Sequence, residues 1–198
     1  MNPEAETAAR LQDILSTFYA GGMSRDQARS AIIDAVQERL GCQRVSLWKF
    51  EGAPGSLSLL CFASKTTGGA LDTSERRLHQ AQYRDYFNAL VEHSVFVAAD
   101  AMNEPALQPM REPYLVANNV LSMLDAAFML NGRAYGMICC EETTSPRVWR
   151  PPEVAALRAI VNKLALIMSG AEHSLLWATP SLPLRPIAPQ GVPPSPSH

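Results

Sequence analysis

The chain has 198 residues, of which 47% are hydrophobic and 18% charged, and its formal net charge is −2 at pH 7. These values predict one globular domain with a sizeable core, and they exclude a whole-chain attraction to nucleic acid or to an anionic membrane. The N-terminus is acidic where a secretory signal would be basic, and no run of 18 apolar residues occurs. We therefore expect a cytoplasmic protein with no membrane partner.

Two helices are predicted to open the domain. Residues 4–20 repeat apolar side chains at three- and four-residue steps, as on one face of a helix. Ser24 and Gln27 have the spacing of a capping box at the start of a second helix, and Gly41 stands where a left-handed C-cap is needed.

Strands and one further helix follow. Arg44–Phe50 alternates apolar and polar residues, and a Gly-Pro-rich turn joins it to Leu57–Ala63 as a hairpin. Residues 83–91 have the apolar spacing of an amphipathic helix, and Ser94–Ala99 is predicted to be a short strand. Arg76 and Arg77, the only adjacent basic pair, are expected on a solvated helix face.

The dipeptide Asn131-Gly132 predicts a two-residue hairpin turn with positive φ at both positions. It joins Leu121–Leu130 to Arg133–Glu142, and both strands are apolar at nearly every position. Strands of this kind are covered on both faces, so the sheet should be the middle of three layers.

A helix at residues 152–170 and the two N-terminal helices are expected to form one outer layer. The other layer must come from residues 72–118, where three prolines after residue 100 allow only short helical turns. An irregular lid of this kind predicts a small-molecule pocket between lid and sheet.

The composition changes near the C-terminus, where prolines recur about every third residue. We therefore divide the chain into one domain over residues 1–175 and a Pro-rich disordered tail over residues 176–198. The alternative for this tail is a docking peptide for an aromatic groove in a partner.

At this point the residues resemble a known family, the GAF domains of bacterial signalling proteins. The segments that carry the resemblance are Tyr86–Leu90, Val97–Ala101, Leu121–Asp125, the Asn131-Gly132 turn, Gly136–Glu141 and Trp149 before a Pro-Glu helix start. They occur in the family's order over about residues 11–168. The resemblance implies an α+β, PAS-like fold: a central antiparallel sheet, helices on one face, and an irregular lid and pocket on the other.

The resemblance also implies a function. Such domains bind cyclic nucleotides, bilins, haem or small metabolites, and they often dimerise through their terminal helices. We expect a sensory module that binds an unidentified small molecule, forms a homodimer and signals in trans through a partner protein. The candidate dimer residues are Leu11, Leu15, Phe18, Leu157, Val161, Leu164 and Met168. The alternative is an interaction or dimerisation module whose pocket is filled by its own side chains.

Candidate ligand-binding residues lie on the lid and on the strands that face it. They are Trp48, Phe50, Tyr83, Phe87, Asp100, Tyr114, Met123, Asp125 and Glu141. Asp125 and Glu141 stand in apolar strands, and a buried carboxylate must find a donor. That donor is a backbone amide, an arginine such as Arg133, or a ligand.

No covalent bilin, no haem and no catalysis are expected, and the identity of any other cofactor is left open. Neither His79 nor His93 has a cysteine neighbour for covalent bilin attachment, and both are expected at exposed helix ends rather than as haem ligands. The four cysteines lack the spacing of a metal site and are expected to be buried. A Cys-based free methionine sulfoxide reductase is the enzymatic alternative, but it needs an exposed, low-pKa cysteine. We therefore predict no metal, no catalytic residue and no enzyme activity.

Overall fold

The computed structural model describes residues 2–169 and 176–177 of the chain. The helical elements are α1 (Pro3–Tyr19), α2 (Arg25–Leu40), α3 (Arg84–His93), the short turns η1 (Pro105–Met110) and η2 (Arg111–Val116), and α4 (Pro151–Ile167). The strands are β1 (Arg44–Glu51), β2 (Ser58–Thr66), β3 (Arg76–His79), β4 (Val95–Ala98), β5 (Ser122–Leu130) and β6 (Arg133–Glu142).

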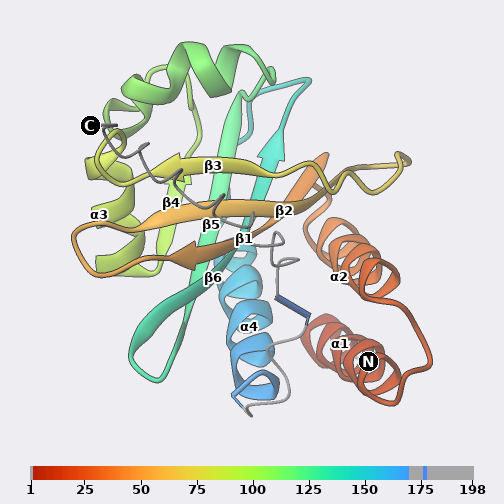
Figure 1. Cartoon of the computed structure of the whole chain (residues 1–198). Coiled ribbons are helices and arrows are strands. Elements are labelled where there is room, and N and C mark those ends of the chain that lie inside the picture. The colour runs from red at the N-terminus through yellow and green to blue at the C-terminus, as the bar shows by residue number, and fades with distance from the viewer. Residues whose placement is uncertain (1, 170–175, 178–198) are drawn as a thin grey trace, which may run out of the picture.

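The six strands form one antiparallel sheet in the order β3-β2-β1-β6-β5-β4 (Figure 1). The predicted hairpin is confirmed: Asn131 and Gly132 both have positive φ, 51° and 75°, between β5 and β6. Both strands are buried over most of their length, so the sheet is covered on both faces as the sequence predicted.

Helices cover one face of this sheet. In Figure 1, α2 and α4 lie against the strands and α1 lies against α2 and α4. The capping box of α2 is confirmed, because Ser24 Oγ accepts from the Gln27 amide at 3.2 Å and Gln27 Oε1 accepts from the Ser24 amide at 2.7 Å. Gly41 closes α2 with φ 63°.

The apolar stripes of α1 and α4 pack against other parts of this same chain. Six of the seven candidate dimer residues are at most 2% exposed and belong to the helix-side core, while Phe18 is half-buried against it. The six are Leu11, Leu15, Leu157, Val161, Leu164 and Met168. A second copy would therefore have to bind the outer surface of these helices. The homodimer stays a prediction.

The opposite face is covered by the predicted lid, which consists of α3, η1, η2 and their connections (Figure 1). A second apolar core lies under it. Lid and sheet pack closely there, since Trp48, Tyr86, Phe87, Leu107 and Leu115 are at most 2% exposed. The three-layer prediction is thus confirmed.

Arg76 and Arg77 do not lie on a helix, so this expectation is wrong. They begin β3, a four-residue strand at the edge of the sheet, where Arg76 pairs with Cys61 of β2. A strand this short carries no readable period, and its pairing with β2 rather than its own residues decides its conformation.

The predicted boundary of the tail is also wrong by two residues. Leu176 and Trp177, which we assigned to the tail, are fully buried in the helix-side core. Residues 178–198, the rest of the predicted tail, lie outside the described residues. Within the described part of the chain, no helix is both long and apolar enough to cross a membrane.

Candidate functional site

A set of polar side chains lies on the lid side of the sheet, inside the molecule. Strand alternation brings Arg44 and Ser46 of β1 to the same face as Glu141 of β6, because Arg44 pairs with Glu141 in register. Asp125 of β5 and Arg76 of β3 complete this face, and Tyr86 and Tyr114 reach it from α3 and η2. We call Arg44, Arg76, Tyr86, Tyr114, Asp125 and Glu141 the lid-face polar cluster.

Glu141 is fully buried and has two strong partners. Its Oε2 accepts from Arg44 Nε at 2.5 Å, and its Oε1 accepts from the Tyr114 hydroxyl at 2.8 Å. Burial alone would lower the pKa of Arg44, but the Glu141 carboxylate outweighs burial and raises it. The arginine is therefore held as a cation, although its buried Nη2 has no hydrogen-bond partner among the described residues.

Asp125 is equally buried and lies beside an aromatic hydroxyl and a thiol. Tyr86 donates to its Oδ2 at 2.6 Å, whereas its buried Oδ1 has no hydrogen-bond partner among the described residues. Burial raises the pKa of Asp125 to about 7, and its interactions with Cys139 and Tyr86 oppose this rise. The side chain therefore titrates near neutral pH.

Arg76 forms the outer edge of the cluster. Its Nη2 donates to Ser64 Oγ at 2.7 Å and lies 3.6 Å from Cys61 Sγ, and its side chain is 34% exposed. Its Nε is buried and has no partner in the described part of the chain. Arg76 keeps a raised pKa although burial opposes it, and the Tyr114 hydroxyl is among the groups whose charge interactions raise it.

Three polar atoms of this cluster are thus buried without a partner among the residues that the structure describes: Arg44 Nη2, Arg76 Nε and Asp125 Oδ1. Leaving a buried polar group unpaired costs about 1–3 kcal/mol, and native proteins contain few such groups. Buried polar groups of this kind are paired by ordered water or by a bound group, so these three atoms are the candidate contact points on this face of the sheet.

The structure brings most of the predicted ligand-binding residues together. Trp48, Phe50, Phe87, Tyr114 and Met123 belong to the lid-side core, with Asp125 and Glu141 at its polar centre, and Tyr83 packs against its edge half-buried. Asp100 does not join them, because it is exposed and accepts from Asn103. Arg133 is not the donor for either acid; it is exposed beside the hairpin turn.

Sequence reasoning missed Arg44, Arg76 and Tyr86 as site residues. Arg44 could have been predicted as a site residue, because alternation along β1 puts it on the same face of the sheet as Ser46 and Trp48. Tyr86 lies in the predicted amphipathic helix at residues 83–91, and nothing in its spacing shows that its hydroxyl reaches Asp125. No sequence pattern indicated that Arg76 is a site residue, because the strand that carries it, β3, was not predicted.

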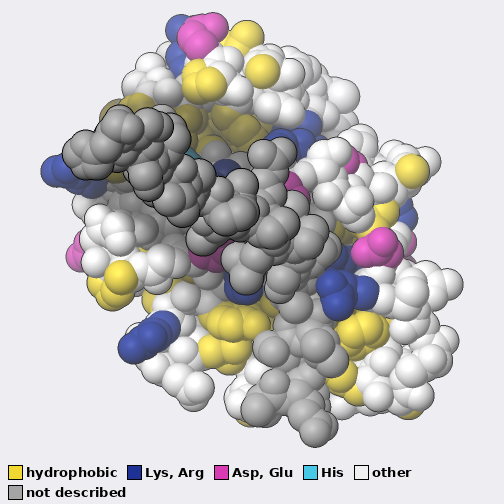
Figure 2. All heavy atoms as spheres, in the orientation of Figure 1, with side chains coloured by type: hydrophobic (Ala, Val, Ile, Leu, Met, Phe, Trp, Pro, Cys, Tyr) yellow, Lys and Arg dark blue, Asp and Glu magenta, His cyan; other side chains and the backbone are white. Residues whose placement is uncertain are grey.

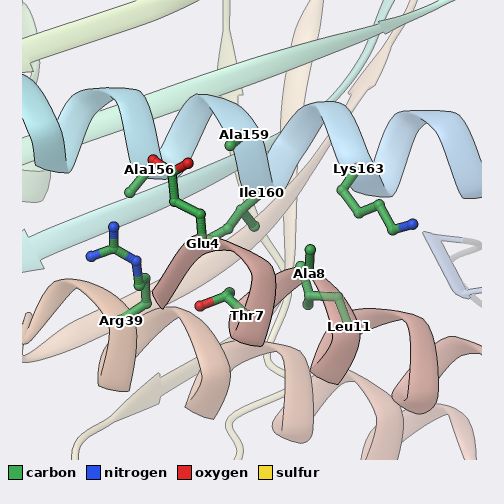
Figure 3. Close-up of a pocket in the computed structure, with 9 residues that line it drawn as sticks. All are labelled: Glu4, Thr7, Ala8, Leu11, Arg39, Ala156, Ala159, Ile160 and Lys163. Carbon is green, nitrogen blue, oxygen red and sulfur yellow. The ribbon is translucent and has the colours of Figure 1, made fainter. Parts of the chain in front are cut away.

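Among the described residues, several cavities lie away from this cluster, and two of them bear on small-molecule binding. One, of about 620 Å³, is a groove between the β1–β2 turn, α3 and the β5–β6 hairpin, lined by Leu57, Asn88, Glu92 and Arg133 among others. The other is a gap of about 30 Å³ between α1 and α4, over Leu11 and Ile160 (Figure 3). A space this small holds one or two water molecules and no larger ligand.

The cysteines are all free and buried, as predicted. Burial raises the pKa of Cys61, Cys139 and Cys140, so none of these three thiols is activated as a nucleophile. Among the described residues, no three of the His, Cys, Asp and Glu side chains are grouped as metal ligands. The face of the molecule in Figure 2 shows basic and acidic side chains interspersed, in keeping with the small net charge.

An antiparallel sheet with a helical layer on one face and a lid on the other is the architecture of PAS-like folds. A family model described as "GAF domain" matches residues 24–168. The chain belongs to the GAF domain family. No curated protein matches it.

Solved structures agree with this assignment. The phycocyanobilin-bound GAF domain of a cyanobacterial phytochrome is 19% identical with a TM-score of 0.65, over 88% of this chain and 97% of that one. The blue-light absorbing form of the Thermosynechococcus elongatus PixJ GAF domain is 14% identical with a TM-score of 0.60, over 81% and 88%. The chromophore-binding domain of the R. palustris bacteriophytochrome RpBphP3 is 15% identical with a TM-score of 0.64, over 87% and 62%.

These relatives correct one expectation. From the sequence we expected no covalent bilin, because no cysteine adjoins His79 or His93. The similar GAF domains hold bilins, among them phycocyanobilin, phycoerythrobilin and biliverdin. The exclusion was therefore wrong: a missing Cys-His neighbour pair does not remove bilins from the candidate cofactors of this fold.

Proposed function

We propose that the chain is a cytoplasmic sensory GAF domain that binds a small molecule bearing an acidic group at the lid-face polar cluster. The observation that carries this proposal is the set of buried polar atoms on Arg44, Arg76 and Asp125 that have no partner among the described residues. Binding would be relayed in trans to a partner protein, as a shift between two arrangements of the lid.

The chemistry of the cluster favours an anionic ligand group. Glu141 already neutralises Arg44, whereas Arg76 contacts a thiol, a hydroxyl and, at 3.8 Å, the half-exposed carboxylate of Asp72. A carboxylate or phosphate at either guanidinium group would pair its free nitrogen in a charge-assisted hydrogen bond. Asp125, which is protonated below about pH 7, can donate to or accept from a polar group of the same ligand.

A bilin belongs to this ligand class. It carries carboxylates that suit Arg44 and Arg76, and the thiols of Cys61 and Cys139 lie on the same face of the sheet. Such a large group needs room, and Trp48 and Tyr114 fill the space between the sheet and η2. Bilin binding therefore requires η1 and η2 to move away from the sheet.

The experiment is a thermal-shift and titration series with biliverdin, cyclic GMP, cyclic AMP and short dicarboxylates. We expect one acid-bearing compound to raise the Tm of the natural protein and to lose this effect in Arg76→Gln. The matched control is Arg77→Gln, one residue further along β3, where the side chain pairs with Glu51. A panel without any binder, or equal binding by both variants, would reject the proposed site.

The close packing under the lid supports a second candidate, an interaction module that dimerises. The surface open to a second copy is the outer side of α4, where Leu166 is 71% exposed. Light scattering tests it: a dimer that Leu166→Glu converts to a monomer supports this candidate. A monomer at all accessible concentrations contradicts it.

We also propose that the chain is not an enzyme. A Cys-based reductase needs a thiolate, and burial raises the pKa of Cys61, Cys139 and Cys140. Turnover of free methionine sulfoxide by the purified protein, abolished when all four cysteines are replaced, would overturn this proposal.

A further inference from the structure

We infer that the free edge of β4, together with a hollow beside it, is the docking surface for an extended segment of a partner protein. That segment alternates apolar side chains along its length and carries an acidic group. The inference rests on the proposed function in one respect, since a domain that signals in trans needs a surface for its partner. β4 (Val95–Ala98) is the last strand of the sheet, so one of its sides has no neighbouring strand among the described residues (Figure 1).

The unpaired side of β4 presents backbone hydrogen-bonding groups. The Ser94 carbonyl accepts from the Ala127 amide at 2.9 Å, immediately before the β4–β5 ladder begins. Antiparallel strands exchange hydrogen bonds at every second residue, so Val95 and Val97 direct their N–H and C=O groups away from β5. Within the part of the chain that the structure describes, these groups bond no other element. A strand added here would pair with both residues, as in peptide recognition by β-augmentation.

The two edges of the sheet differ in their side chains. The opposite edge is β3, which carries Arg76 and Arg77, and charged residues on an edge strand hinder its pairing with another chain. β4 has the sequence VFVA, without a charge. Val97 in this strand is 42% exposed. The β4 edge therefore lacks the charges that protect the β3 edge.

A mostly apolar hollow of about 500 Å³ adjoins this edge at the start of α4. Its lining residues are Val97, Trp149, Pro151, Val154, Ala155 and Arg158. Trp149 is 5% exposed, and the Arg147 guanidinium lies 4.5 Å from its ring centroid. Arg147 in turn pairs with Glu142 and Glu153, so the ring is held in place. Alternate side chains of an added strand point to one face of the sheet, and those on this face lie over the hollow.

One cation of the hollow has no ion pair among the described residues. Arg158 is exposed, and its Nη2 donates to the His93 carbonyl at 3.4 Å. Arg150, at the start of the same helix, pairs with Glu153. An acidic group on the partner would complement Arg158. A second copy of this chain, paired through β4 about a two-fold axis, would instead place two unpaired Arg158 side chains on the same side of the joined sheet. The charge therefore favours an acidic partner over a second copy.

The β4 edge also lies close to the lid-face polar cluster. Phe96 pairs with Asp125 in register, and its ring stands edge-on to that of Tyr86 with the centroids 5.1 Å apart. α3 ends at His93 and passes into β4 through Ser94, whose φ is 58°. A partner on this edge is therefore one strand away from the site at which we propose that a small molecule binds.

The test titrates the full chain, without a small-molecule ligand, with synthetic seven-residue peptides. The first peptide alternates valine and threonine and ends in glutamate. Two others have the same side chains but N-methyl groups on one or the other set of alternate amides. We expect the first peptide to bind and to shift the NMR signal of the Trp149 indole, which Trp149→Phe assigns. One N-methylated peptide should bind roughly tenfold more weakly, because its hydrogen bonds to β4 are lost. No binding by the first peptide, or equal binding by all three, would reject the docking surface.

Variants of the chain locate the binding. Val97→Lys places a charge on the edge and should weaken binding of the first peptide roughly tenfold. The matched control is Val116→Lys on η2, where the valine is 48% exposed, and it should bind as the natural protein does. Arg158→Glu should prefer a peptide that ends in lysine. Arg76→Gln, which changes the polar cluster, should leave peptide binding unchanged. Equal binding by Val97→Lys and Val116→Lys would contradict the inference.

Hydrogen exchange of the Val95 and Val97 amides tests whether the edge is free. Both amides should exchange rapidly in the chain alone and at least roughly tenfold more slowly with the first peptide bound. Slow exchange in the chain alone would show that a second copy or another part of this chain already covers the edge, and it would overturn the inference. A ligand panel without a binder leaves these measurements unaffected, so failure of the proposed function and failure of the docking surface are separate results.

Discussion

The hydroxyl of Tyr86 on α3 donates a 2.6 Å hydrogen bond to Oδ2 of Asp125 on β5, and both residues are buried. This bond joins the lid to the centre of the sheet. Burial raises the pKa of both groups, which shows that neither is solvated in the folded protein. The lid is therefore held to the sheet by polar contacts that depend on protonation, as well as by apolar packing.

Replacement of Tyr86 by Phe should destabilise the protein, because Asp125 loses its hydroxyl donor inside the core. We expect a loss of about 1–3 kcal/mol in the free energy of unfolding. Urea unfolding followed by circular dichroism measures it. Tyr83→Phe, on a half-buried ring at the edge of the same lid, is the control and should cost much less. Equal effects at both positions would contradict the role of the Tyr86 bond.

Asp125 should make the stability depend on pH. Its pKa is about 7 in the folded chain against 3.8 for an unperturbed group. Between these values the folded state binds a proton that the unfolded state does not, so stability falls as the pH rises towards 7 and is constant above it. The effect is at most about 4 kcal/mol. Asp125→Asn should remove this slope, and unfolding curves at pH 5, 6, 7 and 8 compare the two proteins.

Replacements of Arg44 and Glu141 should have strongly non-additive effects on the free energy of unfolding. Arg44→Met leaves a carboxylate buried without its cation and should cost about 3–5 kcal/mol. The double variant with Glu141→Leu should recover a large part of this loss, since no charge then remains. The exposed pair Arg77–Glu51 is the control, and its removal should cost less than about 1 kcal/mol. Additive effects in the buried pair would disprove the coupling.

The hairpin turn should require a residue that accepts positive φ. Gly132 has φ 75°, and a Cβ added there would meet no other atom within 4 Å, so Gly132→Ala suffers from backbone strain alone. We expect a loss of about 1–2 kcal/mol for alanine and a smaller loss for Gly132→Asn, because Asn enters this region more easily. Thermal unfolding of the two variants ranks them. An alanine variant as stable as the natural protein would contradict this account of the turn.

The parts of the fold that the sequence predicted depend on short stretches of chain. Positive φ at Asn131-Gly132 and the capping box at Ser24 are properties of two to four neighbouring residues, and both predictions are confirmed. The layers followed from strands that are apolar on both faces. The fold family followed from the order of such segments along the chain.

Only the tertiary structure decided how the candidate site is assembled. Arg44 and Glu141 are 97 residues apart in the chain, and register alone makes them partners in place of Arg133. Arg76 reaches the cluster through a four-residue edge strand without a local signal, and Trp177 packs against Phe62 and Phe128 of distant strands. Local conformation is set by neighbouring residues, whereas the partner of a buried polar group is set by which distant strands pair and in which register.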